Sequence, residues 1–173
     1  GIEANLDKIQ AILNMEAPQN IKEVQSLTGQ VAALNRFVSK TTDKCLPFFK
    51  VLRKTFEWMD ECQKTFQDLK IYLTMACLLS PSMLGEELYL YLVVTPHAVS
   101  SALIREEGRV QKLVYYTSRA FRGVEGWYPL IEKLAFALII ASRKLRHYFQ
   151  AHVINVMTAY PLKKAMNKLE AAR

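Results

Sequence analysis

The most apolar part of the sequence lacks acidic residues. Between Glu87 and Glu106 there is no carboxylate, so this stretch offers a divalent metal ion no anionic oxygen ligand. Cysteine is scarce as well. The three cysteines are odd in number and show no CxxC spacing (Cys45, Cys62, Cys77). Neither a zinc site nor a disulfide framework is therefore predicted, and a reducing compartment fits best.

Long apolar runs and a targeting segment are also missing. The longest late run, Leu134–Ala141, is too short to cross a bilayer. No signal peptide opens the sequence. We therefore expect no membrane partner and a location inside the cell, in the cytoplasm, the nucleus or both.

The composition predicts a folded, basic protein. The chain has 173 residues, of which 51% are hydrophobic, and a formal net charge of +7. Such a chain can build a sizeable core. Its charge permits binding to a polyanion such as nucleic acid, although many basic domains are simply soluble.

The first half of the chain shows helical periodicity. A short helix is predicted over residues 5–14, and Asp60 is predicted to cap a later helix that runs from Glu61 to about Thr74. Between them, apolar residues recur every three or four positions from Ile21 to Val38, and Asn20 with Glu23 reads as a capping box. A shorter element follows, capped by Thr42 and Asp43, with several basic residues.

The second half alternates strands and helices. Strands are predicted at 86–94, 98–106 and 110–118, then a long helix at 128–150, a strand at 152–158 and a helix at 162–171. The fold class is α/β (α+β), with four helices followed by a βββαβα unit. A soft domain boundary is expected at about residue 80.

Several stretches combine into one family pattern. These are IKEVQSLTGQVAALNRFVSK, LPFFKVLRKTFEWMDECQKTFQDLKIYL, VYYTSRAF, WYPLIEKLAFALIIASRKLRHYF and INVMTAYPLKK. In this order and spacing the chain resembles the reverse transcriptase polyprotein of gypsy-class LTR retrotransposons, with plant elements the nearest. The resemblance implies thumb and connection helices over residues 1–80. It further implies a truncated ribonuclease-H-like domain over residues 81–173.

The same resemblance implies hydrolysis of the RNA strand of a hybrid by two magnesium or manganese ions held on carboxylates. The family positions of three acids are occupied here by Val93, Leu134 and Ala159. Valine, leucine and alanine cannot coordinate a divalent ion, although a shifted helix start could bring Glu132 to the site. We therefore predict no catalytic residues, no metal ligands and no cofactor. Because the polymerase palm is also missing, polymerisation is not expected from this chain.

Basic residues are the candidate nucleic-acid contacts. A thumb would place several of them near phosphates, and their alternative reading is a solvated charged face. The candidates are Arg36, Lys40, Lys44, Lys50, Arg53, Lys54 and Arg119. For Arg143, Lys144 and Arg146 compensation of the helix dipole is the favoured reading. Trp58 and Trp127 are interpreted as packing residues rather than as platforms for bases.

Three functions follow from these observations. The first is a catalytically inactive, retrotransposon-derived module that binds RNA–DNA hybrid or other nucleic acid without sequence preference. The second is a host-domesticated protein-interaction module, in which residues 153–158 form an exposed sheet edge that adds a partner's strand or a second copy. The third is residual ribonuclease activity on hybrids.

Overall fold

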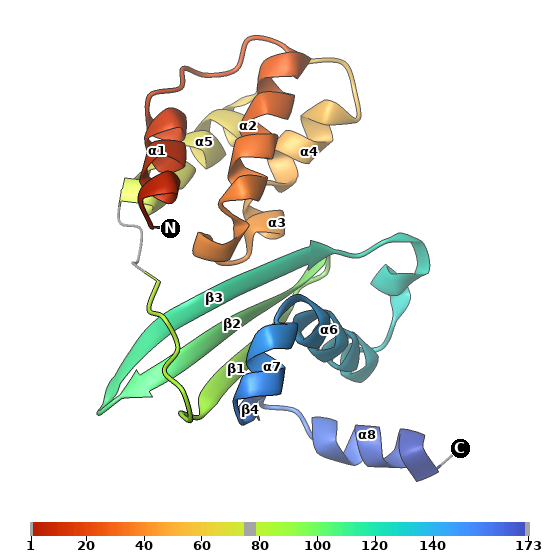
Figure 1. Cartoon of the computed structure of the whole chain (residues 1–173). Coiled ribbons are helices and arrows are strands. Elements are labelled where there is room, and N and C mark those ends of the chain that lie inside the picture. Colours follow the sequence, from red (N-terminus) through yellow and green to blue (C-terminus); the bar gives the residue numbers. More distant parts are fainter. Residues whose placement is uncertain (1, 75–78, 172–173) are drawn as a thin grey trace.

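The computed structural model describes residues 2–74 and 79–171. Two stacked parts are visible in Figure 1, a helical unit and a sheet unit. Each has its own cluster of buried apolar side chains. One cluster runs from Ile12 to Leu73, and the other from Leu88 to Leu162. The boundary expected near residue 80 falls between the clusters and stays a prediction. Cys77 lies outside the described residues.

The helical unit contains one short 3-10 turn and five α-helices. They are α1 (Ile2–Leu13), α2 (Ile21–Ala33), η1 (Asn35–Phe37), α3 (Thr41–Lys44), α4 (Leu46–Leu52) and α5 (Asp60–Thr74). Asn20 caps α2 as predicted, because its Oδ1 accepts a hydrogen bond from the Glu23 N–H at 3.0 Å. The Glu23 carboxylate in turn accepts from the Gln19 N–H at 2.6 Å.

The predicted helix over Ile21–Val38 is shorter than expected. Helix α2 ends at Ala33, and the chain continues through η1 to Lys40, which has a φ of +49°. Leu34 and Val38 are nevertheless fully buried. The apolar spacing was misleading because the 3-10 turn presents its side chains to the same core as the helix before it.

The sheet unit is built on a four-stranded mixed sheet in the order β3-β2-β1-β4. Its strands are β1 (Leu88–Val94), β2 (Ala98–Glu107), β3 (Val110–Ala120) and β4 (Ile154–Met157). The pairs β1–β2 and β2–β3 are antiparallel, whereas β4 runs parallel to β1. The predicted ends of these four strands all lie within two residues of the observed ends. The α/β class is confirmed.

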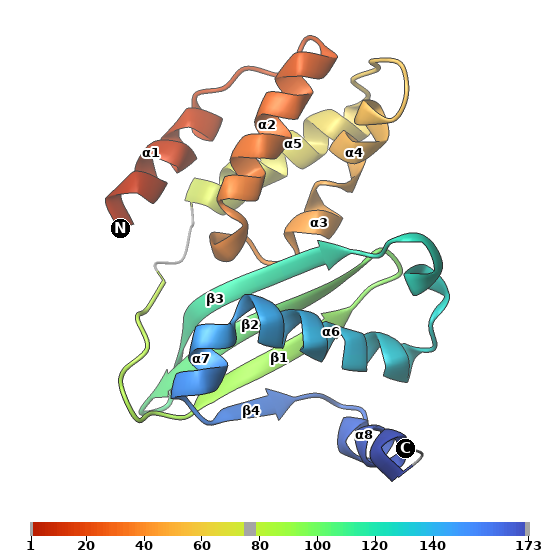
Figure 2. The same ribbon diagram turned by 45° about the vertical axis from the view of Figure 1, so that its right-hand side comes forward.

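Helices α6 (Leu130–Lys144) and α7 (Arg146–Ala151) lie on one face of this sheet (Figure 2). The turn η2 (Gly123–Trp127) precedes α6, and α8 (Leu162–Ala171) packs against α6. The single helix predicted over 128–150 is wrong, because the chain leaves helical geometry at Leu145, with φ −105° and ψ 26°. Leu145 is fully buried there. The break lets α7 turn towards β4, as Figure 2 shows.

The two units meet along β3, and β4 lies at the far edge of the sheet (Figure 2). The Thr42 N–H donates to Ser118 Oγ at 3.2 Å. Asp43 Oδ1 accepts from Thr95 Oγ1, in the β1–β2 turn, at 2.8 Å. These contacts join α3 to the sheet. None of the described helices is both long and apolar enough to cross a membrane.

Candidate nucleic-acid interface

The three positions that the family resemblance assigns to acids come from different elements. Val93 is the penultimate residue of β1, and Ala159 follows β4. The first four residues of β1 pair with the β4 residues 66 positions later, from Leu88–Ile154 to Tyr91–Met157. Extending the same offset places Ala159 level with Val93. The strand register thus brings these two positions to one end of the sheet.

Leu134, the third position, is 3% exposed and packs in the core under the sheet. Glu132, which a shifted helix start could have brought into play, is exposed on α6. Val93, Leu134 and Ala159 carry no oxygen on their side chains. Among the described residues, no three His, Cys, Asp or Glu side chains gather closely enough to hold a metal ion. These positions therefore do not fit the divalent ions that the resemblance implies.

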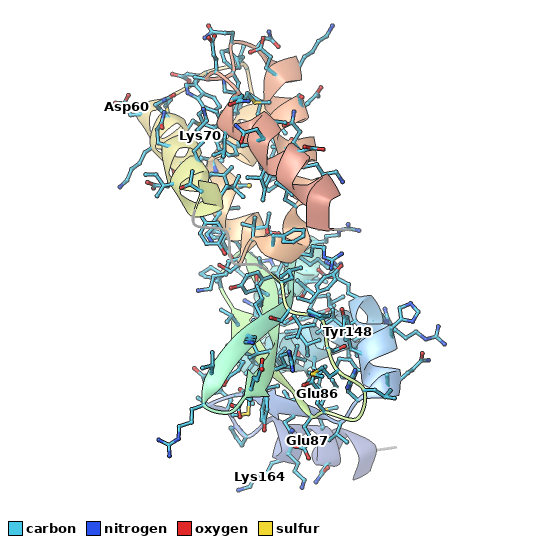
Figure 3. All side chains as sticks on the ribbon, turned by 60° about the vertical axis from the view of Figure 1, so that its left-hand side comes forward. Asp60, Lys70, Glu86, Glu87, Tyr148 and Lys164 are labelled. Carbon is cyan, nitrogen blue, oxygen red and sulfur yellow. The ribbon has the colours of Figure 1, made fainter. Side chains whose placement is uncertain are left out.

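The nearest acids before β1 serve another purpose. Glu86 accepts a hydrogen bond from Arg105 Nε at 3.1 Å, and Glu87 accepts one from Asn155 Nδ2 at 2.9 Å. Figure 3 shows both glutamates in the sheet unit, far from Asp60 at the tip of the helical unit. They stand at the opposite end of β1 from Val93, which is roughly 20 Å away at the rise of a strand. Neither can replace a missing ligand.

One acid does reach the relevant end of β1, and sequence reasoning missed it. Asp43, interpreted from the sequence as a helix cap, comes from α3 and binds Thr95 just beyond β1. Its second oxygen, Oδ2, is buried without a hydrogen-bond partner. Nothing in the sequence links residue 43 to residue 95. A single carboxylate holds magnesium weakly, so Asp43 serves here as a contact between the two units.

Three of the predicted basic contacts are engaged within the protein. Lys50 pairs with Glu61 at 3.5 Å. Arg119 makes a two-pronged ion pair with Glu125, at 3.1 Å for each contact. Lys44 Nζ donates to the Ser39 carbonyl and hydroxyl oxygens, at 2.8 and 2.9 Å.

Burial lowers the pKa of Lys44, although the neighbouring Tyr72 works in the opposite direction. The ammonium also lies 3.8 Å from the centre of the Tyr72 ring. Lys44 is therefore tied into the helical unit rather than directed at a ligand. Lys50 and Arg119 use some of their N–H groups on their carboxylate partners. Fewer of these groups are therefore left to bind a phosphate.

The other predicted contacts are exposed and have no carboxylate partner among the described residues. Lys40, Arg53 and Lys54 are exposed, and so is Arg36. Arg53 and Lys54 line a groove of about 330 Å³ together with Lys50, but Glu57 and Glu61 share its wall. Arg36 lies elsewhere, on η1. The predicted set thus forms no single patch, and whether it binds nucleic acid stays a prediction.

The two tryptophans differ from one another. Trp58 packs as predicted, stacked 5.7 Å from Phe48, with its Nε1–H donating to Gln63 at 2.8 Å. Trp127 contradicts the prediction, because it is 89% exposed in η2. Trp127 is the last residue of η2, and the ion pair between Glu125 and Arg119 connects this turn to β3. The sequence shows no periodicity in this turn, so the exposure of Trp127 could not be predicted.

Burial also decides the state of the described cysteines. Cys45 and Cys62 are both buried free thiols. Burial raises the pKa of Cys45 to about 12 and raises that of Cys62 as well. Neither thiol is therefore set up as a nucleophile, because the thiolate is the reactive form.

The chain is similar to parts of known retroelement proteins. It is 24% identical over 172 residues to the retrovirus-related Pol polyprotein from transposon opus of Drosophila melanogaster, covering 91% of this chain and 17% of that protein. It is 23% identical over 160 residues to the transposon Tf2-3 polyprotein of Schizosaccharomyces pombe, covering 87% and 11%. The chain thus spans less than a fifth of these relatives.

Solved structures share the fold. The foamy viral protease–reverse transcriptase in complex with dsDNA superposes with a TM-score of 0.77 at 20% identity, over 94% of this chain and 34% of that one. The same viral enzyme in complex with RNA/DNA hybrid gives 0.71 at 21% identity, over 87% and 21%.

A family model supplies the assignment. The model of the RNase H-like domain found in reverse transcriptase matches residues 58–156, which is 99 of the 173 residues. The match begins in the helical unit, just before α5, and runs to β4. It takes in all four strands together with α6 and α7. The protein therefore belongs to the family of RNase H-like domains found in reverse transcriptases.

Proposed function

We propose that this chain is a non-catalytic module of a retrotransposon reverse transcriptase that binds nucleic acid, RNA–DNA hybrid above all, without reading its sequence. A gypsy-class element of plant type is the proposed source, on the strength of the motifs quoted above, and the module acts inside the cell. The observation that carries the proposal is a contrast: the positions of three family acids are apolar, whereas several exposed arginines and lysines have no carboxylate partner among the described residues.

The apolar positions support the loss of hydrolysis. A two-metal mechanism needs anionic oxygens around both ions, to neutralise them and to activate water. Val93 lies near the end of β1 and Ala159 follows the end of the neighbouring strand β4, and Leu134 is buried in the core. Replacing one acid would weaken a metal site, and here three of the positions that the family gives to acids are apolar.

The exposed cations support binding. Phosphate contacts from Lys and Arg release counterions and need no base recognition. Arg36, Lys40 and Arg53 are exposed and have no ion pair among the described residues. The viral enzyme that shares this fold has been solved with both dsDNA and RNA/DNA hybrid. Both ligands present a phosphate backbone, which is the feature that the proposed contacts would use.

A salt-titrated binding assay tests the proposal. Fluorescence anisotropy is measured with labelled RNA–DNA hybrid, duplex DNA and single-stranded RNA, each with and without Mg²⁺ or Mn²⁺. Affinity should fall steeply as salt rises and should not require the metal. The same hybrid, run on a gel after incubation, should stay intact. A flat salt dependence would overturn the binding, and metal-dependent cleavage would establish the alternative of residual ribonuclease.

The second candidate function is that of a protein-interaction module, domesticated by a host genome. In the described sheet β4 has a neighbour on one side only, and Val153 and Met157 are 63% and 40% exposed. Such an edge can accept a further strand. Light scattering compares the parent chain with the variant V153K/M157K, whose charges disfavour edge pairing. A parent chain that is dimeric and a variant that is monomeric would support this function. If both the parent chain and the variant are monomeric, self-pairing through this edge is rejected.

A further inference from the structure

A second groove, here called the β3 groove, lies where η1 and the end of α2 meet β3 and the end of α6. Its volume is about 300 Å³. Arg36 and Lys144 stand in its wall with Tyr115 and Tyr116, and Ala33 contributes only a methyl group. None of the described residues that line it is acidic. This distinguishes it from the groove beside α4, where two glutamates face the cations.

Arg36 is held in place without being neutralised. Its guanidinium carbon lies 5.1 Å from the centre of the Tyr115 ring and 5.3 Å from that of Phe37. Stacking on aromatic rings orients the planar guanidinium while leaving its N–H groups at the edge available to an oxygen ligand. No carboxylate of the described residues pairs with it.

Lys144 meets the groove from the other unit. Its Nζ donates to the Ser118 carbonyl oxygen at 3.0 Å, which fixes the ammonium beside β3 and leaves two of its three N–H groups for other acceptors. Partial burial of the ammonium lowers the pKa of Lys144, and the nearby charge of Arg119 lowers it further. Arg119 has Glu125 as a counterion, whereas Lys144 has none among the described residues.

We propose that the β3 groove holds a phosphate of a bound nucleic-acid backbone between Arg36 and Lys144. This rests on the proposed function and names the place where one phosphate sits. An anion there would supply the negative charge that neither side chain finds among the described residues. It would also tie the helical unit, through η1, to the sheet unit, through α6. The sequence favoured dipole compensation for Lys144, because this residue lies among the basic residues at the end of a predicted helix. Nothing along the chain links residues 36 and 144.

The variant R36Q/K144Q tests the proposal against the matched control R109Q/R143Q. Both variants lower the net charge by two. Arg109 and Arg143 are exposed, lie outside the groove and have no ion pair among the described residues. In anisotropy titrations with RNA–DNA hybrid, the groove variant should bind roughly 5–10-fold more weakly at low salt. Its log–log salt dependence should be shallower by about one. The control should change less than half as much on a logarithmic scale.

A second measurement needs no substitution and so does not depend on folding of a variant. Lysines of the parent chain are acetylated with and without saturating hybrid, and the products are quantified by mass spectrometry. Lys144 should be protected severalfold, whereas the exposed Lys163 on α8 should not.

The outcomes separate the two proposals. If the parent chain does not bind hybrid, the proposed function fails and this inference fails with it. If the parent chain binds but the groove variant matches the control and Lys144 stays unprotected, only the groove assignment is overturned. Weaker binding by the groove variant together with protection of Lys144 supports both.

Discussion

At the scale of single residues, Val93 and Ala159 occupy two positions that the family resemblance gives to acids. Both lie at one end of the β1–β4 pair, and neither is fully buried. Carboxylates placed there would be accessible to water, and extending the β1–β4 register would bring them close to one another. Two such groups repel when both are ionised, and a divalent ion relieves that repulsion by binding between them.

We therefore expect the variant V93D/A159D to gain thermal stability when Mn²⁺ is added at neutral pH, while the parent chain shows no such gain. Melting temperatures with Mn²⁺ and with a chelator measure the effect. The amide variant V93N/A159N is the control, because it is similar in shape and carries no charge. A parent chain stabilised by Mn²⁺ as much as the aspartate variant would contradict the view that its own ligands are lost.

At the scale of elements, hydrophobic periodicity predicted most of the helices and strands. Features that depend on single tertiary contacts could not be predicted from the sequence. The strands and α5 were placed correctly because their apolar positions repeat and turn residues bound them. The ends of α2 and α6 were misplaced, since η1 and the break at Leu145 keep their side chains in the core. The contact of Asp43 with Thr95 and the outward direction of Trp127 depend on tertiary packing. No local pattern encodes either.

Thr95 links the β1–β2 turn to α3, and its loss should be measurable. Its hydroxyl donates to Asp43 and accepts from the Ala98 N–H at 3.1 Å. Replacing Thr95 by Val keeps the shape but leaves the partly buried Asp43 carboxylate without a donor. We expect the free energy of unfolding to fall by about 1–3 kcal/mol in urea titrations. Thr95→Ser keeps the hydroxyl and should lose much less. A loss for Thr95→Ser as large as that for Thr95→Val would contradict this assignment, because the serine hydroxyl can keep the hydrogen bond.

An acid-sensitive ion pair between Arg119 and Glu125 joins β3 to the turn η2. Burial alone would raise the pKa of Glu125, but the Arg122 N–H and the Arg119 guanidinium together hold it below its ordinary value. A carboxyl whose pKa is lowered by folding stabilises the protein above its unfolded-state pKa of about 4.3. That contribution disappears as the pH falls through the lower folded-state value.

Glu125→Gln should therefore lower the melting temperature at neutral pH, and its difference from the parent chain should shrink towards about pH 3. Thermal unfolding followed by circular dichroism over this range measures the trend. Glu132→Gln removes an exposed carboxylate of α6 that forms no ion pair among the described residues, and it should show little of this dependence. A difference for Glu125→Gln that is constant with pH would show that the carboxylate acts through its shape rather than its charge.

At the scale of the whole molecule, two apolar clusters are joined mainly by polar contacts. No buried side chain belongs to both clusters among the described residues. Thr42, Asp43 and Arg36 supply contacts from the helical unit to β3 and to the β1–β2 turn. Polar contacts of this kind couple the unfolding of two units less strongly than a shared apolar core does. The two units should therefore be able to unfold separately.

Leu27 and Leu103 are the matched probes of this separation, because each is fully buried in one cluster. Leu27→Ala should destabilise the helical unit by about 2–5 kcal/mol while amide exchange in β1 stays nearly unchanged. Trp58, which packs in the helical core, reports that unit by fluorescence once Trp127 is replaced by Phe. Leu103→Ala should do the reverse, accelerating exchange in β1 and leaving the Trp58 transition in place. If both substitutions lower both signals together, the polar joint couples the units as strongly as a common core would. The phosphate proposed for the β3 groove would then strengthen a coupling that already exists, instead of creating it.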